Sequence, residues 1–403
     1  MIQINIDHFI KKQITKREES LFLEDILENK SSLIRGIRNT SVLVIGGGGT
    51  IGASFIRALL EFKPSRLYVV DSNENALTEL TRDLRSAPNQ YVPKDFKTYP
   101  MNFSDDVFHK MLINEGPFDI VANFAAYKHV RSEKDHYSIE AMLENNVFRA
   151  KNLLDILNEH PPSHFFCVST DKAANPVNVM GASKKLMEDV IFAYSRHLKI
   201  TTARFANVAF SNGCLLDGYM YRLMKGQPIS CPSDVKRFFV SPEESGQICL
   251  LACILGKSGE IFFPKLAEHE LVLFKDITLH FFEELAIPVV ECNSAEEART
   301  LAASYLPGKP YPVYFSPSDT SGEKLYEEFY TESDEVDLST YTGMGVIKNA
   351  VRPTMKRVTL CLEELKSLCS SGQYDKSSII GLMKKFLPVF DHIEKGKGLD
   401  DIM

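Results

Sequence analysis

Short apolar runs alternate with amphipathic segments through the first half of the chain. Short stretches that we interpret as strands lie at 41–45, 67–70, 97–103, 118–126, 164–168 and 201–208, and most of them are rich in Val, Ile, Leu and Phe, as buried strands are. Between the first of these runs, apolar residues recur at helical spacing, as at 56, 59 and 60 and at 76, 77, 80 and 84. This alternation predicts a parallel, doubly wound sheet with helices on both faces.

The pattern is less regular after about residue 210. It predicts an apolar helix at 243–255, a strand at 259–263, a helix–strand–helix unit over 275–305, and two helices at 360–368 and 378–393. The predicted fold is an α/β Rossmann-type sheet with a smaller mixed α/β substrate-binding domain and C-terminal helices. We expect a helical lead-in at 1–38, a Rossmann domain at 39–210 with later strands from about 235–265, a substrate-binding region at 211–335 and a helical extension at 336–403.

Composition narrows the class of protein. The 403 residues are 44% hydrophobic and 25% charged, as in ordinary globular proteins, and the net charge of −7 gives no basic field for nucleic acid. No apolar run approaches the about 20 residues that span a bilayer, and the N-terminus lacks a signal-peptide pattern. The eight cysteines are scattered without a C-x-x-C pair. We therefore expect a cytoplasmic protein with no membrane span, nucleic-acid partner or metal.

A glycine-rich turn follows the first predicted strand. Residues 46–52 read Gly-Gly-Gly-Gly-Thr-Ile-Gly and open a helix, and Asp71 closes the next strand. Strand, glycine turn, helix, strand and acid form the dinucleotide-binding arrangement, in which helix amides face the pyrophosphate. Asp71 can accept hydrogen bonds from the adenosine ribose and would repel a 2′-phosphate, which favours NAD over NADP. A merely structural turn is the alternative.

Other strand ends add candidate contacts to this cofactor. Asn102 ends the third predicted strand and could face the adenine, and the small residues Ala125 and Ala126 would let a ring or ribose approach the backbone. The candidate cofactor-binding residues are Gly46, Gly48, Gly49, Thr50, Ile51, Gly52, Asp71, Asn102, Ala125, Ala126 and Lys184.

Polar groups cluster after the strand at 164–168. Thr170, Asp171 and Lys172 stand at its carboxyl end, and a helix opening near Met180 places Lys184 one turn further on. Ligands of open α/β sheets bind at this edge, so these five residues are the catalytic candidates. The alternative is a strand-end turn with an Asp–Lys surface pair, which the cofactor motif upstream makes less attractive.

These motifs resemble those of the extended short-chain dehydrogenase/reductases, and among them the nucleotide-sugar 4,6-dehydratases of the CapD/PglF-like polysaccharide biosynthesis family. The resemblance covers about 38–330 and extends to Lys128-His129-Val130, Asn146-Val147, Arg204-Phe205-x-Asn207-Val208, Asn212-Gly213, Arg237-Phe238-Phe239 and Gly322-Glu323-Lys324-Leu325-Tyr326-Glu327-Glu328. Many relatives carry a membrane anchor that this chain lacks, which predicts a soluble form. Residues around 294–312 have no counterpart in the family's pattern.

One departure from the wider superfamily bears on the reaction. Its members normally carry Tyr-x-x-x-Lys, and here Met180 takes the place of the tyrosine. Methionine cannot take a proton, so a 4-epimerase that uses that tyrosine is disfavoured. The resemblance associates this replacement with dehydratases that retain configuration at carbon 5.

The resemblance implies NAD-dependent 4,6-dehydration of a UDP-N-acetylhexosamine, foremost UDP-N-acetylglucosamine, for bacterial glycan or nonulosonic-acid biosynthesis. It gives Asp171 the role of protonating the departing 6-hydroxyl and Lys172 that of removing the carbon-5 proton. Thr170 would relay the 4-hydroxyl proton, and Lys184 would bind the nicotinamide ribose. A 4-epimerase of the same fold and a catalytically silent NAD-binding scaffold are the rival interpretations.

The resemblance also supplies substrate-side candidates and a partner. Arg237 could bind two diphosphate oxygens at once, and Asn207 a sugar or nucleotide group. Lys128 and His129 could contact the substrate or form an ordinary polar loop. The candidate substrate-binding residues are Lys128, His129, Asn207, Asn212, Arg237 and Glu323. A homodimer or higher homo-oligomer is expected by resemblance.

Overall fold

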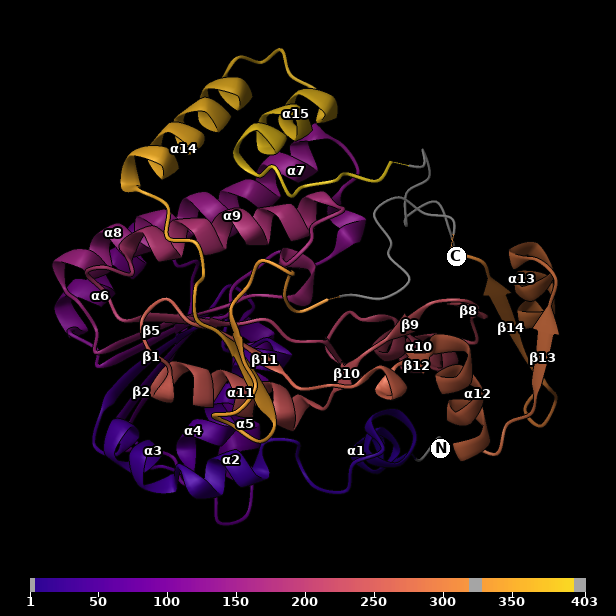
Figure 1. The fold of residues 1–403 in the computed structure, drawn as a ribbon. Helices are drawn as coiled ribbons and strands as arrows, with labels where there is room; N and C mark the ends of the chain where they lie inside the picture. The colour runs from indigo at the N-terminus through magenta and orange to yellow at the C-terminus, as the bar shows by residue number, and fades with distance from the viewer. Residues whose placement is uncertain (1–3, 319–327, 395–403) are drawn as a thin grey trace.

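Nine strands form the main sheet, in the order β15-β16-β11-β6-β5-β4-β1-β2-β3 (Figure 1). The structure is a computed structural model and describes residues 4–318 and 328–394. The strands are β1 (Ser41–Ile45), β2 (Arg66–Asp71), β3 (Asp95–Pro100), β4 (Ile120–Asn123), β5 (His164–Val168), β6 (Ile200–Ala203), β11 (Ile261–Pro264), β15 (Val336–Asp337) and β16 (Met344–Ile347). In this order, the seven neighbouring strands β11, β6, β5, β4, β1, β2 and β3 are all parallel, which confirms the doubly wound sheet.

The strand order reverses next to β1. From β1 the chain adds β2 and β3 on one side, and then returns to place β4, β5 and β6 on the other. In the register of the sheet, Ile45 pairs with Val70 of β2 and with Asn123 of β4. The crevice beyond these carboxyl ends is the switch point at which open α/β sheets bind their ligands.

Helices cover both faces of the sheet. One face carries α4 (Thr50–Leu60), α5 (Glu74–Ser86) and α11 (Pro242–Leu255), and the other carries α6 (Asp106–Glu115), α8 (Arg149–Glu159) and α9 (Val179–Tyr194). A further layer of α14 (Met355–Ser370) and α15 (Lys376–Phe386) lies over α9 and α7 (His136–Leu143) (Figure 1). Because this layer leaves α9 buried along nearly its whole length, the helix offers little surface for a subunit contact, and the expected homo-oligomer stays a prediction.

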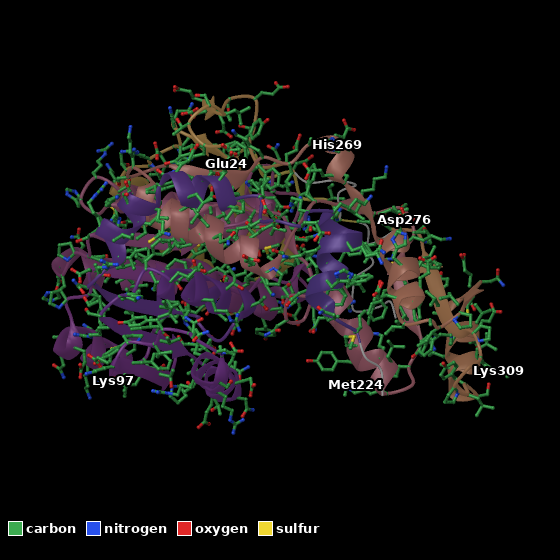
Figure 2. All side chains as sticks on the ribbon, turned by 90° about the horizontal axis from the view of Figure 1, so that it is seen from below. Glu24, Lys97, Met224, His269, Asp276 and Lys309 are labelled. Atoms are coloured by element: carbon green, nitrogen blue, oxygen red, sulfur yellow. The ribbon has the colours of Figure 1, made fainter. Side chains whose placement is uncertain are left out.

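A smaller lobe lies beyond the carboxyl ends of the main strands. It holds a parallel sheet in the order β13-β14-β8, from β13 (Val289–Cys292), β14 (Tyr311–Ser316) and β8 (Ile229–Pro232). Its helices are α10 (Leu215–Met224), α12 (Phe274–Glu284) and α13 (Ala295–Ala303). Figure 2 shows this division: Lys97 lies on the large lobe and Lys309 at the far end of the small one. Residues 294–312, which have no counterpart in the family's sequence pattern, form α13 and the start of β14 in this lobe.

The N-terminal lead-in divides between the lobes. Phe9 of α1 (Ile6–Phe9) packs with Phe281 in the core of the small lobe. In contrast, α2 (Leu23–Glu28) and α3 (Lys30–Ile37) belong to the large lobe, where α3 contacts α11. The first 38 residues therefore bridge both parts of the molecule, which their polar composition did not predict.

Several predicted elements are corrected. The third strand ends at Pro100, so Asn102 lies in the following loop. The run at 201–208 is two strands, because the chain leaves the main sheet after Ala203 and β7 (Asn207–Val208) pairs with β10 (Phe239–Val240). Residues 336–347 add β15 and β16 to the main sheet, and the C-terminal helices begin only at Met355. No helix among the described residues is long and apolar enough to cross a membrane.

Candidate active site

The glycine turn packs tightly between β1 and α4. Gly46 has a φ of +76°, and a Cβ there would lie 2.5 Å from the backbone nitrogen of Ala125. A Cβ on Gly52 would lie 2.4 Å from the carbonyl oxygen of Gly46. Side chains are excluded at both positions, so the backbone lies close and open at the start of α4, where a pyrophosphate can approach the helix amides.

Asp71 is held in place at the end of β2. Its Oδ2 accepts a hydrogen bond from the amide of Gly48 at 2.9 Å, and its Oδ1 accepts one from the amide of Asn73 at 2.9 Å. The carboxylate lines the cavity beside the glycine turn. It is therefore oriented by the backbone and can still accept hydrogen bonds from a ribose hydroxyl.

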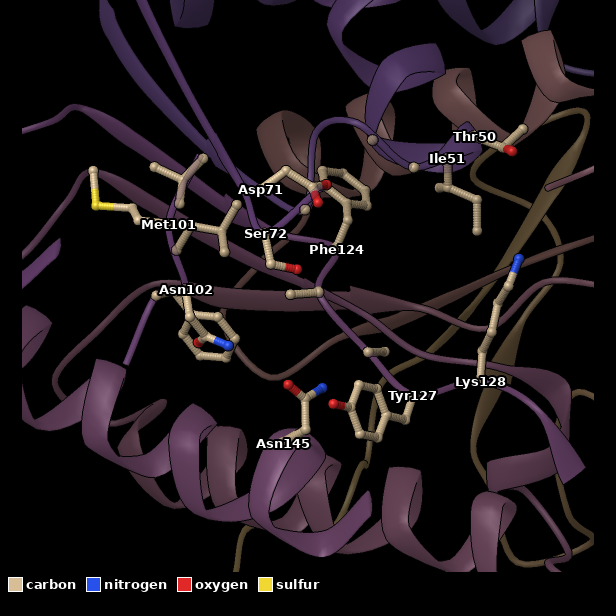
Figure 3. A pocket seen from close by; sticks show the side chains of 18 residues that line it. Thr50, Ile51, Asp71, Ser72, Met101, Asn102, Phe124, Tyr127, Lys128 and Asn145 are labelled. Atoms are coloured by element: carbon tan, nitrogen blue, oxygen red, sulfur yellow. The ribbon is translucent and has the colours of Figure 1, made fainter. Parts of the chain in front are cut away.

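That cavity has a volume of about 210 Å³ and lies at the switch point of the sheet. Figure 3 shows Asp71 and Ser72 on one side of it and Asn145 and Tyr127 on the other. It is lined by nearly all of the predicted cofactor residues: Gly46, Gly49, Thr50, Ile51, Gly52, Asp71, Asn102, Ala125 and Ala126. Gly48 lies behind Asp71, to which its amide donates. The residues present thus fit a dinucleotide.

Sequence reasoning missed part of this wall. Tyr127 and Asn145 line the cavity, and Asn145 is a buried polar residue in a π-helical turn, at Glu144–Phe148. The side chain of its neighbour Asn146 accepts a hydrogen bond from the amide of Tyr127 at 2.8 Å and donates one to the carbonyl oxygen of Tyr127 at 2.9 Å. It also donates to the hydroxyl of Ser183 on α9 at 3.0 Å. The paired asparagines in a helical segment were the available signal.

A second cavity of about 270 Å³ continues from the first, with which it shares Ile51, Phe124, Ala126 and Lys128. All five catalytic candidates line it, and so do Lys128, His129 and Asn207. Apolar side chains that were not among the candidate site residues complete the wall: Val168, Phe205, Leu215, Leu216, Phe239 and Phe274. The predicted polar cluster therefore faces a site between the two lobes.

Thr170, Asp171 and Lys172 form one hydrogen-bonded chain. The Oδ1 atom of Asp171 accepts from the hydroxyl of Thr170 (2.8 Å), from the amide of Lys172 (2.8 Å) and from the ammonium of Lys172 (3.1 Å). Asp171 is 4% exposed. A hydroxyl, a carboxylate and an ammonium group are thus placed so that a proton can pass between them and a ligand in the cavity.

Lys184 is buried next to this chain. Its Nζ donates to the carbonyl oxygen of Val168 at 2.6 Å and lies 3.1 Å from the sulfur of Met187. Burial lowers the pKa of Lys184, against the opposing influence of Cys167 and Glu188. Met180 lies one turn earlier, 3% exposed, and brings only a thioether to the cavity.

The substrate-side candidates divide into two groups. Lys128 donates from Nζ to the carbonyl oxygen of Asn212 at 3.0 Å, and the amide of Asn212 donates to the hydroxyl of Thr50 at 2.9 Å, which links the glycine helix to the small lobe. Burial lowers the pKa of both Lys128 and His129. The second group lies outside both cavities: neither Asn212 nor Arg237, which is buried, is among the residues that line them.

The guanidinium of Arg237 donates to the carbonyl oxygen of Lys236 at 2.9 Å. Its predicted contact with a diphosphate is not visible in the lining of the second cavity and stays a prediction. Glu323 lies outside the described residues, so its predicted role is likewise untested.

Comparison with known proteins places this geometry in a family. The family model described as "Polysaccharide biosynthesis protein" matches residues 42–286. An uncharacterized membrane protein of Methanocaldococcus jannaschii is 31% identical over 77% of this chain and 86% of its own. The capsular polysaccharide biosynthesis protein CapD of Staphylococcus aureus is 29% identical over 78% of this chain, but the match covers only 49% of CapD.

An inverting UDP-N-acetylglucosamine 4,6-dehydratase of Campylobacter jejuni is 26% identical over 56% of this chain and 67% of its own. Among solved structures, Pen from Bacillus thuringiensis superposes with a TM-score of 0.63 at 20% identity, over 79% of this chain and 90% of its own. WbmF of Bordetella bronchiseptica, in complex with NAD⁺ and UDP, has a TM-score of 0.51 at 21% identity, over 70% of this chain and 85% of its own. These structures share the fold.

Proposed function

Since the chain belongs to the polysaccharide biosynthesis protein family of extended short-chain dehydrogenase/reductases, we propose that it removes water from a UDP-N-acetylhexosamine, with NAD as cofactor. The substrate we propose is UDP-N-acetylglucosamine, and the product is the 4-keto-6-deoxy sugar, with configuration retained at carbon 5. Relatives named for capsular polysaccharide biosynthesis and for 4,6-dehydration of UDP-N-acetylglucosamine support the proposed reaction. The named dehydratase is an inverting one, so the proposed retention at carbon 5 rests on Met180.

One observation carries the choice of reaction. Met180 occupies the position of the superfamily's tyrosine and lines the same cavity as Thr170, Asp171 and Lys172. A thioether cannot exchange a proton with a sugar hydroxyl, so proton transfer falls to the Thr170–Asp171–Lys172 chain. That chain offers both an acid and a base, which elimination of water needs and a simple epimerisation does not.

NAD would be held by the glycine turn, Asp71 and the remaining lining of the first cavity. When bound, it would accept a hydride from carbon 4 of the sugar and return it to carbon 6. Thr170 takes up the 4-hydroxyl proton and passes it to Asp171, with which it is hydrogen-bonded. Lys172 removes the proton from carbon 5, and Asp171 protonates the 6-hydroxyl as it leaves as water. Lys172 then returns its proton to carbon 5 on the same face, as the hydride is delivered to carbon 6. Lys184, with its lowered pKa, orients the ribose end of the cofactor.

The test is the mass of the product formed from UDP-N-acetylglucosamine. A dehydratase gives a product lighter by one water, an epimerase gives an isomer of equal mass, and a silent scaffold returns the substrate. Asp171→Asn and Lys172→Ala should each lose dehydration and keep NAD binding, because neither residue lines the first cavity. Unchanged turnover in either variant would refute the assigned roles.

A further inference from the structure

Glu133 lies behind the loop that carries Lys128 and His129, and its side chain is 6% exposed. Its Oε2 atom accepts a hydrogen bond from the amide of Val179 at 2.7 Å. Val179 is the first residue of α9, and Met180 follows it directly. The first amides of a helix lack partners within the helix, so Glu133 supplies one of them from outside, with a charge that suits the helix N-terminus.

The other carboxylate oxygen of Glu133 is held by the C-terminal part of the chain. Oε1 lies 3.2 Å from Nζ of Lys376, at the start of α15, and contacts Nε2 of His392. Lys376 also pairs with Glu394 at 2.6 Å. Glu133 therefore receives a hydrogen bond from the catalytic helix on one side and cationic or donor groups from residues 376–394 on the other.

The same C-terminal segment is bonded to the loop in front of α9. The amide of Asp391 donates to the carbonyl oxygen of Pro176 at 3.1 Å, and that of Ile393 to the carbonyl oxygen of Val177 at 2.9 Å. This loop joins Lys172 to the first residue of α9. Residues 391–393 thus lie along the connection between the two halves of the catalytic cluster.

A metal site is the alternative explanation for this cluster, since Glu133, His392 and Glu394 could offer ligand atoms within 4.8 Å of one another. The ammonium of Lys376 lies between the two carboxylates, at 3.2 Å and 2.6 Å. A cation of the chain itself therefore already pairs with both carboxylates and occupies the space between them, where a metal ion would have to lie.

We propose that Glu133 is a positioning residue of the active site, held in place by Lys376 and His392. By accepting the amide of Val179 it fixes the start of α9, and with it the positions of Met180 and Lys184 relative to Thr170, Asp171 and Lys172. The inference rests on the proposed dehydration. Small displacements matter here, because a misplacement of about 1 Å can cost on the order of 100-fold in rate.

The first test compares two substitutions of Glu133 in the full chain. Glu133→Gln keeps an oxygen that can accept the Val179 amide and should retain kcat within roughly threefold, whereas Glu133→Ala should lower kcat roughly tenfold or more, with KM and NAD affinity little changed. Glu364→Gln is the control, because the Glu364 carboxylate of α14 pairs with Lys385 of α15 at 2.6 Å and not with the amide of Val179. It should leave kcat unchanged.

A second pair of variants tests the donor and covers the case in which Glu133→Ala does not fold. Val179→Pro removes the amide hydrogen at a helix position that favours proline, and Val179→Ala keeps it while trimming the same buried side chain. We expect kcat of Val179→Pro to lie roughly tenfold or more below that of Val179→Ala. Equal kcat values in this pair, or equal losses in Glu133→Gln and Glu133→Ala, would overturn the positioning role. A wild-type chain that releases no water would instead overturn the proposed function.

Discussion

Glu188 and Arg204 form a bidentate ion pair beneath the catalytic cluster, with Nε to Oε1 at 2.9 Å and Nη2 to Oε2 at 2.7 Å. Both side chains are buried. Oε1 of Glu188 also accepts the hydroxyl of Ser169 at 2.7 Å, so the pair ties α9 to the ends of β5 and β6. Because Thr170 follows Ser169 directly, the hydrogen bond between Ser169 and Glu188 fixes the position of the end of β5 relative to α9, the helix that carries Lys184.

Removing one member of this pair should be costly. Arg204→Met leaves the Glu188 carboxylate buried without its bidentate partner, although Lys185 still lies 3.5 Å away. This substitution should destabilise the protein by about 3–5 kcal/mol in urea unfolding. The double variant Arg204→Met/Glu188→Met should recover part of this loss, since no buried charge remains. Arg57→Met is the control, because the Arg57–Asp83 pair is exposed and should contribute at most about 1 kcal/mol. Similar losses of unfolding free energy in Arg204→Met and Arg57→Met would contradict the prediction that the buried ion pair matters more than the exposed one.

The same pair predicts how stability depends on pH. Burial by itself would raise the pKa of Glu188, but the charge and hydrogen bonds of Arg204 lower that pKa from 4.5 to about 2. Since the folded-state pKa lies below the unfolded one, the stabilisation is complete above about 4.5 and is lost as the pH falls toward about 2. Glu188→Gln should therefore show a flatter stability profile than wild type over this range. A difference between the two proteins that does not change with pH would contradict the assignment.

The glycine turn allows a matched test within two helices. Gly52→Ala would force a Cβ to 2.4 Å from a backbone oxygen, so it should abolish NADH binding in a fluorescence titration and lower the melting temperature. Gly381 lies in α15, and a Cβ added to it would have no neighbouring atom within 4 Å. Gly381→Ala should leave NADH binding unchanged and stabilise the helix by about 0.5–1 kcal/mol. Normal binding by Gly52→Ala would mean that the turn is structural only.

The central strands β1, β2, β4, β5 and β11 of the large sheet could be predicted from the sequence because they are buried and read as short apolar runs. The switch point followed from the glycine turn and Asp71, and the catalytic candidates from their place after β5. In contrast, β8, β14 and β16 contain Pro, Cys, Ser or Gly within four to six residues, and each pairs with a strand more than 70 residues away in the chain. Nothing local distinguishes such strands from loops.

The site was predictable where its residues directly follow a predicted strand or open the next helix. Thr170 to Lys184 share a strand end and the next helix, and the structure brings all five candidates to one cavity. Phe274 reaches that cavity from the small lobe, and Glu133 meets His392 across a sequence separation of 259 residues. Contacts of this kind depend on how whole lobes and the C-terminal segment are placed, which no residue spacing records.

Asp71 should set the choice between NAD and NADP. Its carboxylate is fixed by the amides of Gly48 and Asn73 and lines the first cavity. In dinucleotide-binding sites, an acid at this place in the motif accepts from the ribose hydroxyl and would repel a 2′-phosphate. Asp71→Ser removes that charge and should shift the ratio of dissociation constants for NADH and NADPH toward NADPH by at least roughly tenfold, since one close charge pair contributes about 1 kcal/mol or more. Asp106→Ser, which replaces an exposed carboxylate in the first turn of α6, is the control. An unchanged ratio would place the ribose elsewhere.

Met180 offers the sharpest test of the proposed chemistry. If proton transfer belongs to Thr170, Asp171 and Lys172, the side chain at 180 needs only to fill space at the cavity wall, where it is 3% exposed. Met180→Leu conserves volume and polarity and should keep kcat for water loss within roughly threefold, because such swaps cost less than about 1.5 kcal/mol. In contrast, Lys184→Met, which removes a charged group one turn further along the same helix, should lower kcat by far more. Loss of turnover in Met180→Leu, with NADH binding and melting temperature preserved, would show that the sulfur itself takes part and that the proton path must be redrawn.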